Sequence, residues 1–168
     1  MKTILEGNAL VLQDYVDSEQ LHPASYFSLD KNRIREGLFM GMPAHLKAQS
    51  DKQKIIVAGR YFGCGSSREV IVQSLIQNGI RVVLAESFSR IFYRNALNHG
   101  MLLLEIPDIH KQIANNGHVS VELDGSNILI KENKRIICNI KDQERITQII
   151  QANWKKTPFR IDKEEEVV

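Results

Sequence analysis

Three short apolar runs, spaced so that a helix fits between each pair, constrain the fold of this chain most strongly. They cover residues 55–58, 81–85 and 101–106 and are rich in β-branched and aliphatic side chains. Between them, residues 70–76 and 88–98 carry apolar side chains at helical spacing. A strand–helix–strand order implies parallel strands joined by right-handed crossovers. The sequence therefore predicts an α/β fold with a partly parallel sheet flanked by helices.

The residues around these runs predict shorter elements within one domain that spans residues 1–168. With 168 residues and 43% hydrophobic content, the chain matches one ordinary domain. Residues 119–123 alternate apolar and polar side chains before an Asp-Gly turn, which indicates antiparallel strands. The other expected elements are a strand with a turn at 5–12, a polar loop at 14–23, helices at 31–39, 108–116 and 144–150, a linker at 44–53, hairpin strands at 127–130 and 136–140, and a solvated tail at about 161–168.

The charge balance and the absence of long apolar runs narrow the classes of partner. The sequence has 22 basic and 20 acidic residues and a formal net charge of +2, which is no electrostatic footprint for nucleic acid. No apolar run approaches the ~20 residues of a membrane span, and no signal-peptide core follows Met1. We therefore expect a cytoplasmic protein that binds neither nucleic acid nor membrane.

The most informative stretch is residues 63–69, Gly-Cys-Gly-Ser-Ser-Arg-Glu, which we call the serine turn. A strand that leads through a glycine turn into a helix leaves the first helical N–H groups unpaired, and this favours a bound anion. In the least specific interpretation, Ser66 and Glu69 form a capping box that satisfies those groups. A phosphate loop is disfavoured, because the Walker ending is absent and Arg68 replaces the third glycine of a dinucleotide fingerprint.

A carboxylate site is the third interpretation of the serine turn. Arg68 would contact the carboxylate with two N–H groups, Ser67 and the backbone would add hydrogen bonds, and Ser66 would face the reacting atom. A serine hydroxyl is a poor base in water, so Ser66 would need its alkoxide stabilised by a cation, a helix N-terminus and a dry enclosure. One small domain can hardly supply all of these, so this interpretation requires further groups from elsewhere.

A second motif accompanies the serine turn, and the two together carry a family resemblance. Residues 87–96 read Ser-Phe-Ser-Arg-Ile-Phe-Tyr-Arg-Asn-Ala and are followed by Gly100. The pair resembles the swivel domain of the aconitase superfamily and is most similar to small subunits of 3-isopropylmalate dehydratase. This resemblance implies a swivelling β/β/α domain that closes over a separate large subunit. The large subunit would carry a [4Fe–4S] cluster on three cysteines, and this chain would contribute no metal ligand.

The resemblance also implies roles for the residues of the turn. Ser66 matches the family's catalytic serine, whose alkoxide removes a proton from the substrate carbon during dehydration and returns it during rehydration. Ser67 and Arg68 match residues that hold a substrate carboxylate. The open iron of the partner's cluster would take the substrate hydroxyl and a carboxylate as a Lewis acid.

Two residues near the N-terminus match further family positions. Residues 17–23 correspond to the family's amino-terminal pattern, and Glu19 stands where the family has an aspartate beside the active site, one methylene shorter. Ser28 lies in the loop that sets specificity, where aconitase-like and homoaconitase-like members place an arginine for an additional carboxylate. Because an arginine is useful only where there is a carboxylate to pair, Ser28 favours an alkyl-substituted malate. The alternative is that Ser28 is plain loop surface.

The resemblance therefore implies the small subunit of a heterodimeric hydro-lyase that interconverts 2-isopropylmalate and 3-isopropylmalate in leucine biosynthesis and is active only with its large subunit. One alternative is a related dehydratase that acts on another branched malate or on acids of the homoaconitate or methylcitrate type. An alternative of another class is a non-catalytic interaction domain that retains the swivel fold. The second serine and the arginine of the turn argue against that class, because a structural cap requires neither.

The remaining reactive side chains have less specific interpretations. We expect Cys64 to be inert packing rather than a nucleophile, and Cys138 to lie in the core. Without a CxxC pair, the two cysteines indicate neither a disulfide framework nor a metal site. Arg90 and Arg94 share one helical face and favour surface or partner contacts over substrate contacts. The histidines show no metal-ligand spacing, with His22 expected to be extended before a proline and His99 expected at a helix end: His22, His45, His99, His110 and His118.

Overall fold

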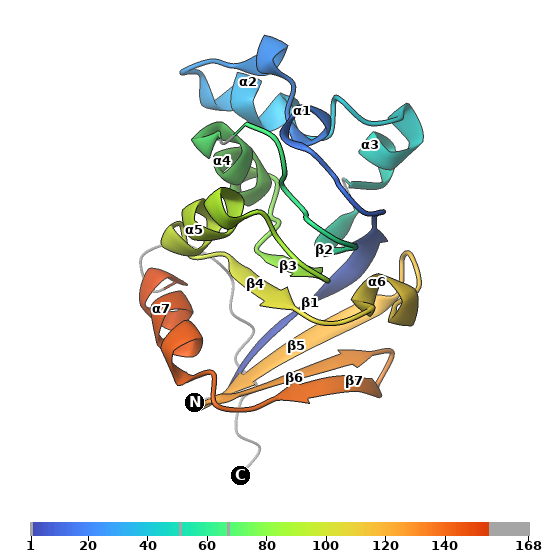
Figure 1. Cartoon of the computed structure of the whole chain (residues 1–168), viewed down its shortest axis with the longest axis vertical. Helices are drawn as coiled ribbons and strands as arrows, with labels where there is room; N and C mark the ends of the chain where they lie inside the picture. The colour runs from blue at the N-terminus through green and yellow to red at the C-terminus, as the bar shows by residue number, and fades with distance from the viewer. Residues whose placement is uncertain (1, 51, 67, 155–168) are drawn as a thin grey trace.

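One seven-stranded sheet organises the residues described by this computed structural model, 2–50, 52–66 and 68–154 (Figure 1). Its strands are β1 (Lys2–Val11), β2 (Gln53–Ala58), β3 (Val82–Ala85), β4 (Leu102–Glu105), β5 (His118–Asp124), β6 (Asn127–Glu132) and β7 (Arg135–Ile140). They are ordered β4-β3-β2-β1-β5-β6-β7. Strands β1 to β4 are parallel, and β5 to β7 continue the sheet antiparallel. The predicted α/β fold with a partly parallel sheet is confirmed.

Helices cover both faces of this sheet. They are α1 (Ser18–Leu21), the 3-10 helix η1 (Ala24–Tyr26), α2 (Lys31–Glu36), α3 (Ala44–Ser50), α4 (Glu69–Gln77), α5 (Arg90–Asn98), α6 (Ile109–Gln112) and α7 (Glu144–Trp154). Residues of α4 and α5 pack into one core cluster, whereas residues of α6 and α7 join β5 and β6 in the other. Figure 1 shows α1 and α2 beyond α4, α3 near β2, and the antiparallel strands curling beneath the parallel ones. None of the helices in the described ranges is long and apolar enough to cross a membrane.

The parallel strands are apolar on both faces because each face contacts a separate core cluster. In β2, Ile56 belongs to the cluster under α4 and α5, while its neighbour Ile55 belongs to the cluster with β5 and β6. Ile55 pairs with Val82 of β3, and Val82 pairs with Leu102 of β4. Buried parallel strands are typically continuous apolar runs for this reason. The three runs in the sequence therefore identified three of the four parallel strands of the sheet.

Three aromatic rings fix the chain after β2 against α5. The ring centroid of Phe62 lies 6.2 Å from that of Phe88 and 5.3 Å from that of Phe92. Phe62 also forms a parallel backbone bridge with Phe88. Buried aromatic pairs at such distances contribute about 0.5–1.5 kcal/mol each beyond their buried area. The serine turn begins at the next residue, so the packing of Phe62 fixes the position of its first residue.

Three predicted elements in the first third of the chain were wrong in detail. Strand β1 runs without a turn, and its irregularity is a register shift between Asn8 and Ala9. The expected linker at 44–53 contains helix α3, and the expected loop at 14–23 contains helix α1. Helix α1 forms because the Asp17 side chain and Gln20 make a reciprocal capping box. A four-residue helix has too few residues for its periodicity to show in a sequence.

The later elements follow the prediction more closely, with shifted ends. The sequence predicts Ser87 as the cap of the helix at 88–98, but the cap of α5 is Ser89, whose hydroxyl accepts from the Phe92 N–H. The Ser87 hydroxyl instead accepts from the Tyr61 N–H at 2.9 Å. Helix α7 extends to Trp154, beyond the expected end at residue 150. Cys138 is half-buried at the margin of the second core cluster, and burial raises the pKa of its thiol. The expected tail at about 161–168 lies outside the described residues.

Substitution of Gly63 tests how tightly the turn is packed. Gly63 has φ +80°, and a Cβ there would lie 2.4 Å from Cγ of Phe92. We expect Gly63→Ala to lower the free energy of unfolding by about 1–2 kcal/mol for the left-handed backbone and by roughly 1–3 kcal/mol more for overpacking. Gly125→Ala is the matched control, since Gly125 has φ +58° and nothing within 4 Å of its Cβ position. Equal losses in urea unfolding of the two variants would contradict this packing.

Candidate active site

The serine turn lies beside the end of β1, at the carboxyl edge of the parallel strands. Asp17 and Cys64 form a parallel backbone bridge, and the Ser18 N–H donates to the Cys64 carbonyl at 2.8 Å. The Gly63 N–H donates to the Val16 carbonyl, also at 2.8 Å. These bonds extend the β1–β2 pairing beyond the strands themselves. They place helix α1 and the residues after it next to the turn.

Arg68 is the centre of this site, because its guanidinium contacts four groups from three segments. Its Nη1 donates to Oε2 of Glu19 at 3.0 Å and to the backbone carbonyl of His22 at 3.1 Å. Its Nε donates to Oγ of Ser66 at 3.1 Å. Its guanidinium carbon lies 4.9 Å from the centroid of the Phe27 ring. With 18% of its side chain exposed, Arg68 is held in one orientation and still reaches the surface.

Ser66 is exposed and does not cap the following helix. Helix α4 begins at Glu69 with Arg68 as its N-cap residue, and no side chain makes a capping hydrogen bond there. The carboxylate of Glu69 instead contacts Nε2 of His99 at 3.1 Å. The capping-box interpretation of the turn is therefore wrong. Ser66 is free for another role, while Ser67 lies outside the described residues.

Glu19 is the anionic partner of Arg68. The hydrogen bond from Arg68 lowers the pKa of Glu19 below its usual value, and the hydrogen bond from the Ala24 N–H lowers this pKa further. The Glu19 carboxylate is therefore ionised at neutral pH, and 59% of its side chain remains exposed. A substrate carboxylate that approaches Arg68 would meet a guanidinium with one anion already beside it. Glu19 thus orients Arg68 and limits how many anions it can bind.

The loop that contains Ser28 forms a shallow pocket with Arg68. The pocket has a volume of about 490 Å³ and is lined by Phe27, Ser28, Leu29, Arg68, Glu69 and Val70. Leu29 is fully exposed and Phe27 is about half exposed, so the rim is apolar. The Ser28 hydroxyl accepts from the Asp30 N–H at 3.0 Å. The structure therefore brings Ser28 and Arg68 to one pocket, whereas Ser66 contacts Arg68 from outside the residues that line it.

Two residues of the site were missed from the sequence. Phe27 stacks against Arg68, and no pattern in the sequence indicates this contact. His22 supplies a backbone carbonyl to Arg68, while its buried ring places Nε2 at 2.9 Å from the Ile34 carbonyl. His22 is the C-cap residue of α1, and its backbone is extended, as the proline after it predicts. Burial lowers the pKa of the His22 ring, so the neutral form is favoured.

Four other side chains singled out from the sequence do not line the Ser28 pocket. Cys64 is partly buried, its thiol contacts the Val16 carbonyl at 3.8 Å, and burial raises its pKa, which disfavours a reactive thiolate. His99 is the C-cap of α5, and its Nδ1 lies 2.7 Å from the Asn95 carbonyl, as expected of a residue at a helix end. Arg90 and Arg94 are exposed on α5 and do not line the Ser28 pocket.

One group of possible metal ligands occurs among the described residues, and Arg60 contacts both of its carboxylates. Asp14, Glu86 and His110 have ligand atoms within 4.8 Å of one another. The two ring nitrogens of His110 face different carboxylates, at 3.9 Å from Asp14 and 4.0 Å from Glu86. Arg60 also contacts both, through its backbone N–H and its Nε. Sequence spacing missed this group because its members come from separate segments.

An iron–sulfur cluster does not fit the thiols of this chain. Cys64 lies in the serine turn and Cys138 in β7, on different elements. Cys138 packs at the margin of the second core cluster, away from the turn. A cluster held by three thiolates needs more cysteines than the chain contains. Such a cluster would have to be held by another chain.

Removal of Arg68 tests the Glu19 contact directly. We expect Arg68→Gln to raise the pKa of Glu19 toward its ordinary value, because the largest cause of its lowering is removed. The native pKa lies below that of the unfolded chain, so this pair stabilises the fold at neutral pH and loses that effect as the pH falls through the native value. Carboxyl chemical shifts measured by NMR report the titration. Arg33→Gln, which removes an arginine that stacks over Tyr26, is the control. An unchanged Glu19 pKa in Arg68→Gln would rule out the contact.

The serine turn and the second motif both lie within a match to one family model. The model is described as the Aconitase C-terminal domain, and it matches residues 30–109. This range contains β2, β3 and β4, three of the four parallel strands, and the helices between them. The match begins after the N-terminal segment that supplies Glu19 and His22. The family model therefore covers most of the parallel part of the sheet and the part of the site that carries Ser66 and Arg68.

Curated relatives and a solved structure are similar over more of the chain. The 3-isopropylmalate dehydratase small subunit of Saccharolobus islandicus (strain L.S.2.15) is 35% identical over 128 residues, 76% of this chain and 78% of that protein. A small subunit of the same name from Lachnospira eligens is 35% identical over 125 residues, 74% of this chain and 76% of that protein. The crystal structure of 3-isopropylmalate dehydratase from Methanocaldococcus jannaschii has a TM-score of 0.74 and 31% identity, and covers 91% of this chain and 93% of that one. The chain belongs to the family of 3-isopropylmalate dehydratase small subunits in the aconitase superfamily.

Proposed function

We propose that this chain is the small subunit of a cytoplasmic hydro-lyase that interconverts 2-isopropylmalate and 3-isopropylmalate in leucine biosynthesis. The observation that carries the proposal is the 3.1 Å contact between Nε of Arg68 and Oγ of an exposed Ser66 that caps no helix. The names of the relatives support the same activity. A large subunit would complete the enzyme.

Ser66 would act as the base that removes and returns the substrate proton. A serine alkoxide is costly, and the positive guanidinium beside Oγ lowers that cost because a charged hydrogen bond strengthens as the oxygen becomes negative. The remaining N–H groups of Arg68 would bind a substrate carboxylate, with Ser67 as a second donor. Glu19 and the His22 carbonyl hold the guanidinium in an orientation that would let it contact both the Ser66 oxygen and a substrate carboxylate. The substrate carbon would then lie over Oγ of Ser66.

The other half of the chemistry belongs to the partner. Membership of the aconitase superfamily suggests that the large subunit carries the [4Fe–4S] cluster, which supplies a Lewis acid for the substrate hydroxyl and a carboxylate. Ser66 is exposed in this chain, so the partner must also exclude water from the site. The Ser66 and Arg68 side chains would face that partner.

The Ser28 pocket favours an alkylmalate as substrate. Its rim is formed by Phe27 and Leu29, which offer apolar surface to an alkyl group. Arg68 is the one cationic side chain that lines it within the described residues, and Glu19 already pairs with Arg68. A third carboxylate on the substrate would therefore find no partner there. Faster turnover of citrate than of isopropylmalate by the assembled enzyme would contradict this assignment.

Replacement of Ser66 tests the catalytic assignment. In the assembled complex, we expect Ser66→Ala to lower kcat by roughly 10²–10⁴-fold, the usual contribution of a general base, with a smaller change in KM. Cys64→Ala, two residues earlier in the same turn, is the matched control and should keep kcat within a few-fold. Absorbance of the unsaturated intermediate measures turnover. A kcat that survives Ser66→Ala, or one lost in Cys64→Ala, would show that the base was assigned wrongly.

A further inference from the structure

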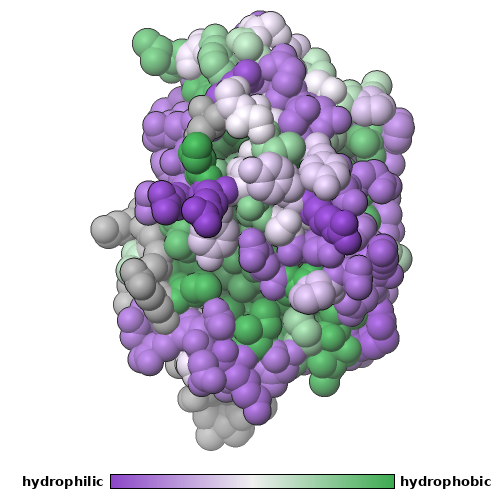
Figure 2. Space-filling model, viewed as in Figure 1, coloured by the Kyte–Doolittle hydropathy of each residue, from purple (hydrophilic) through white to green (hydrophobic). Residues whose placement is uncertain are grey.

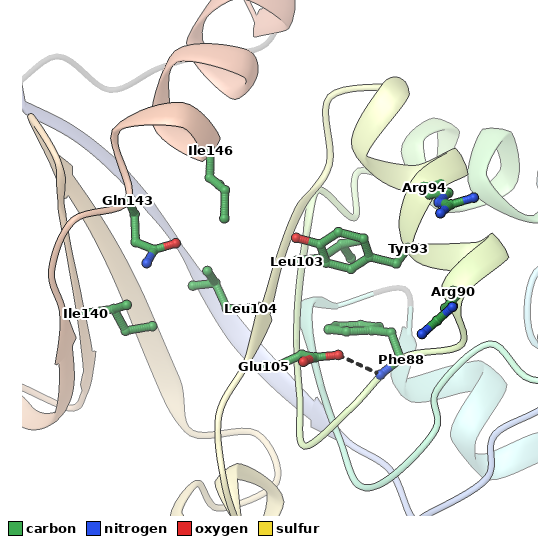
Figure 3. Close-up of a pocket in the computed structure, with 10 residues that line it drawn as sticks. All are labelled: Phe88, Arg90, Tyr93, Arg94, Leu103, Leu104, Glu105, Ile140, Gln143 and Ile146. Carbon is green, nitrogen blue, oxygen red and sulfur yellow. Dashed lines mark hydrogen bonds between the residues drawn. The ribbon is translucent and has the colours of Figure 1, made fainter.

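A second pocket lies between the two edge strands of the curled sheet, which face each other without pairing. Strands β4 and β7 occupy opposite ends of the strand order. Between them and helices α5 and α7 is a pocket of about 430 Å³, to which we refer as the seam pocket (Figure 3). Neither Ser66 nor Arg68 lines it. The seam pocket is therefore separate from the proposed active site.

The floor and far wall of the seam pocket are apolar. Leu103 and Leu104 come from β4, Ile140 from β7 and Ile146 from α7. Figure 2 shows hydrophobic surface between α5 and the antiparallel strands, with strongly hydrophilic residues on either side of it. Ligand pockets of proteins commonly have such a floor and a few polar groups that fix orientation. An aliphatic group fits this part of the pocket.

Three polar side chains at the α5 side of the pocket lack partners. Within the described residues, Arg90, Arg94 and the Tyr93 hydroxyl make no hydrogen bond or ion pair. Figure 3 shows the Tyr93 hydroxyl directed across the pocket toward α7. Both arginines are exposed, so their positive charges are available to a ligand. Two guanidinium groups and a hydroxyl donor bind oxyanions, and a carboxylate is the oxyanion of a ligand that also carries an aliphatic group.

One acidic side chain lies on the same pocket. Glu105, at the end of β4, accepts from the Phe88 N–H at 3.3 Å through Oε1. Its other carboxylate oxygen has no bond to the described residues, and its charge contributes to the raised pKa of Tyr93, which burial raises most. A second carboxylate on a ligand would be repelled by Glu105, whereas an ammonium group would pair with it. The pocket thus offers an anion site, a cation site and an apolar floor.

We propose that the seam pocket binds a small zwitterion with an aliphatic side chain, which is the chemistry of an aliphatic α-amino acid. The ligand carboxylate would bind Arg90 and Arg94, its ammonium group would bind Glu105, and its alkyl group would contact Leu104 and Ile146. A dicarboxylate lacks the ammonium group and meets the charge of Glu105. The site does not depend on the proposed hydro-lyase activity.

Binding to the full chain tests the proposal, with L-leucine as the probe. We expect saturable changes in the methyl NMR signals of Leu104, Ile140 and Ile146. 4-Methylpentanoate, which lacks the ammonium group, and 3-methylbutylamine, which lacks the carboxylate, should each bind roughly tenfold more weakly or less well still, because each loses one charged hydrogen-bonded contact.

Variants locate the site. Arg90→Gln combined with Arg94→Gln should weaken L-leucine binding at least about tenfold. Tyr93→Phe should weaken it less, since it removes one neutral donor. Arg135→Gln, which removes an exposed arginine of β7 that pairs with Glu132, is the matched control. The proposal is overturned by unchanged methyl signals, by equal affinity for the zwitterion and 4-methylpentanoate, or by full binding in the double variant.

Discussion

The parallel pairing of β1 with β2 is the constraint on which the site depends. The pairing continues beyond the two strands as the bridge between Asp17 and Cys64, so the chain that follows β1 lies beside the serine turn. This part of the chain forms helix α1, which is stabilised by its own capping box. Glu19 and the His22 carbonyl reach Arg68 across more than forty residues of sequence only because the two strands are neighbours. Loss of this pairing would leave Arg68 without its anchor.

In the proposed site, Arg68 would bind a substrate carboxylate and stabilise the Ser66 oxygen with different N–H groups, and the free energies involved show why Arg68 is not enough alone. A hydrogen bond to a charged group contributes about 1.5–3 kcal/mol. The contact with Arg68 can therefore supply only a small part of the free energy that a serine alkoxide requires. A hydroxyl ionises far above neutral pH, so most of the stabilisation of an alkoxide must come from a dry enclosure and a Lewis acid. The exposure of Ser66 in this chain is consistent with a site that a partner completes.

The sequence predicted the elements that depend on local sequence or on a repeating pattern of apolar residues. Runs such as Ile55 to Ala58 are apolar throughout because both faces of the strand are buried, and this pattern is visible without a structure. The Ser87 hydroxyl accepts from the Tyr61 N–H, which comes from the turn after β2, so the use of Ser89 as the helix cap could not be predicted from local sequence. The stacking of Phe27 on Arg68 and the seam pocket depend on tertiary packing and sheet curvature in the same way. The family resemblance predicted site roles for Ser66 and Arg68, and the structure shows which groups these two side chains contact.

The central claim is that this chain carries half of an active site, and titration of the subunits tests it most directly. A fixed amount of large subunit with an intact cluster is mixed with increasing amounts of this chain, and dehydration of 2-isopropylmalate is followed by absorbance of the unsaturated product. The claim predicts no turnover by either subunit alone and a rate that rises with added chain to a plateau. Turnover at the plateau rate by either subunit alone would contradict it.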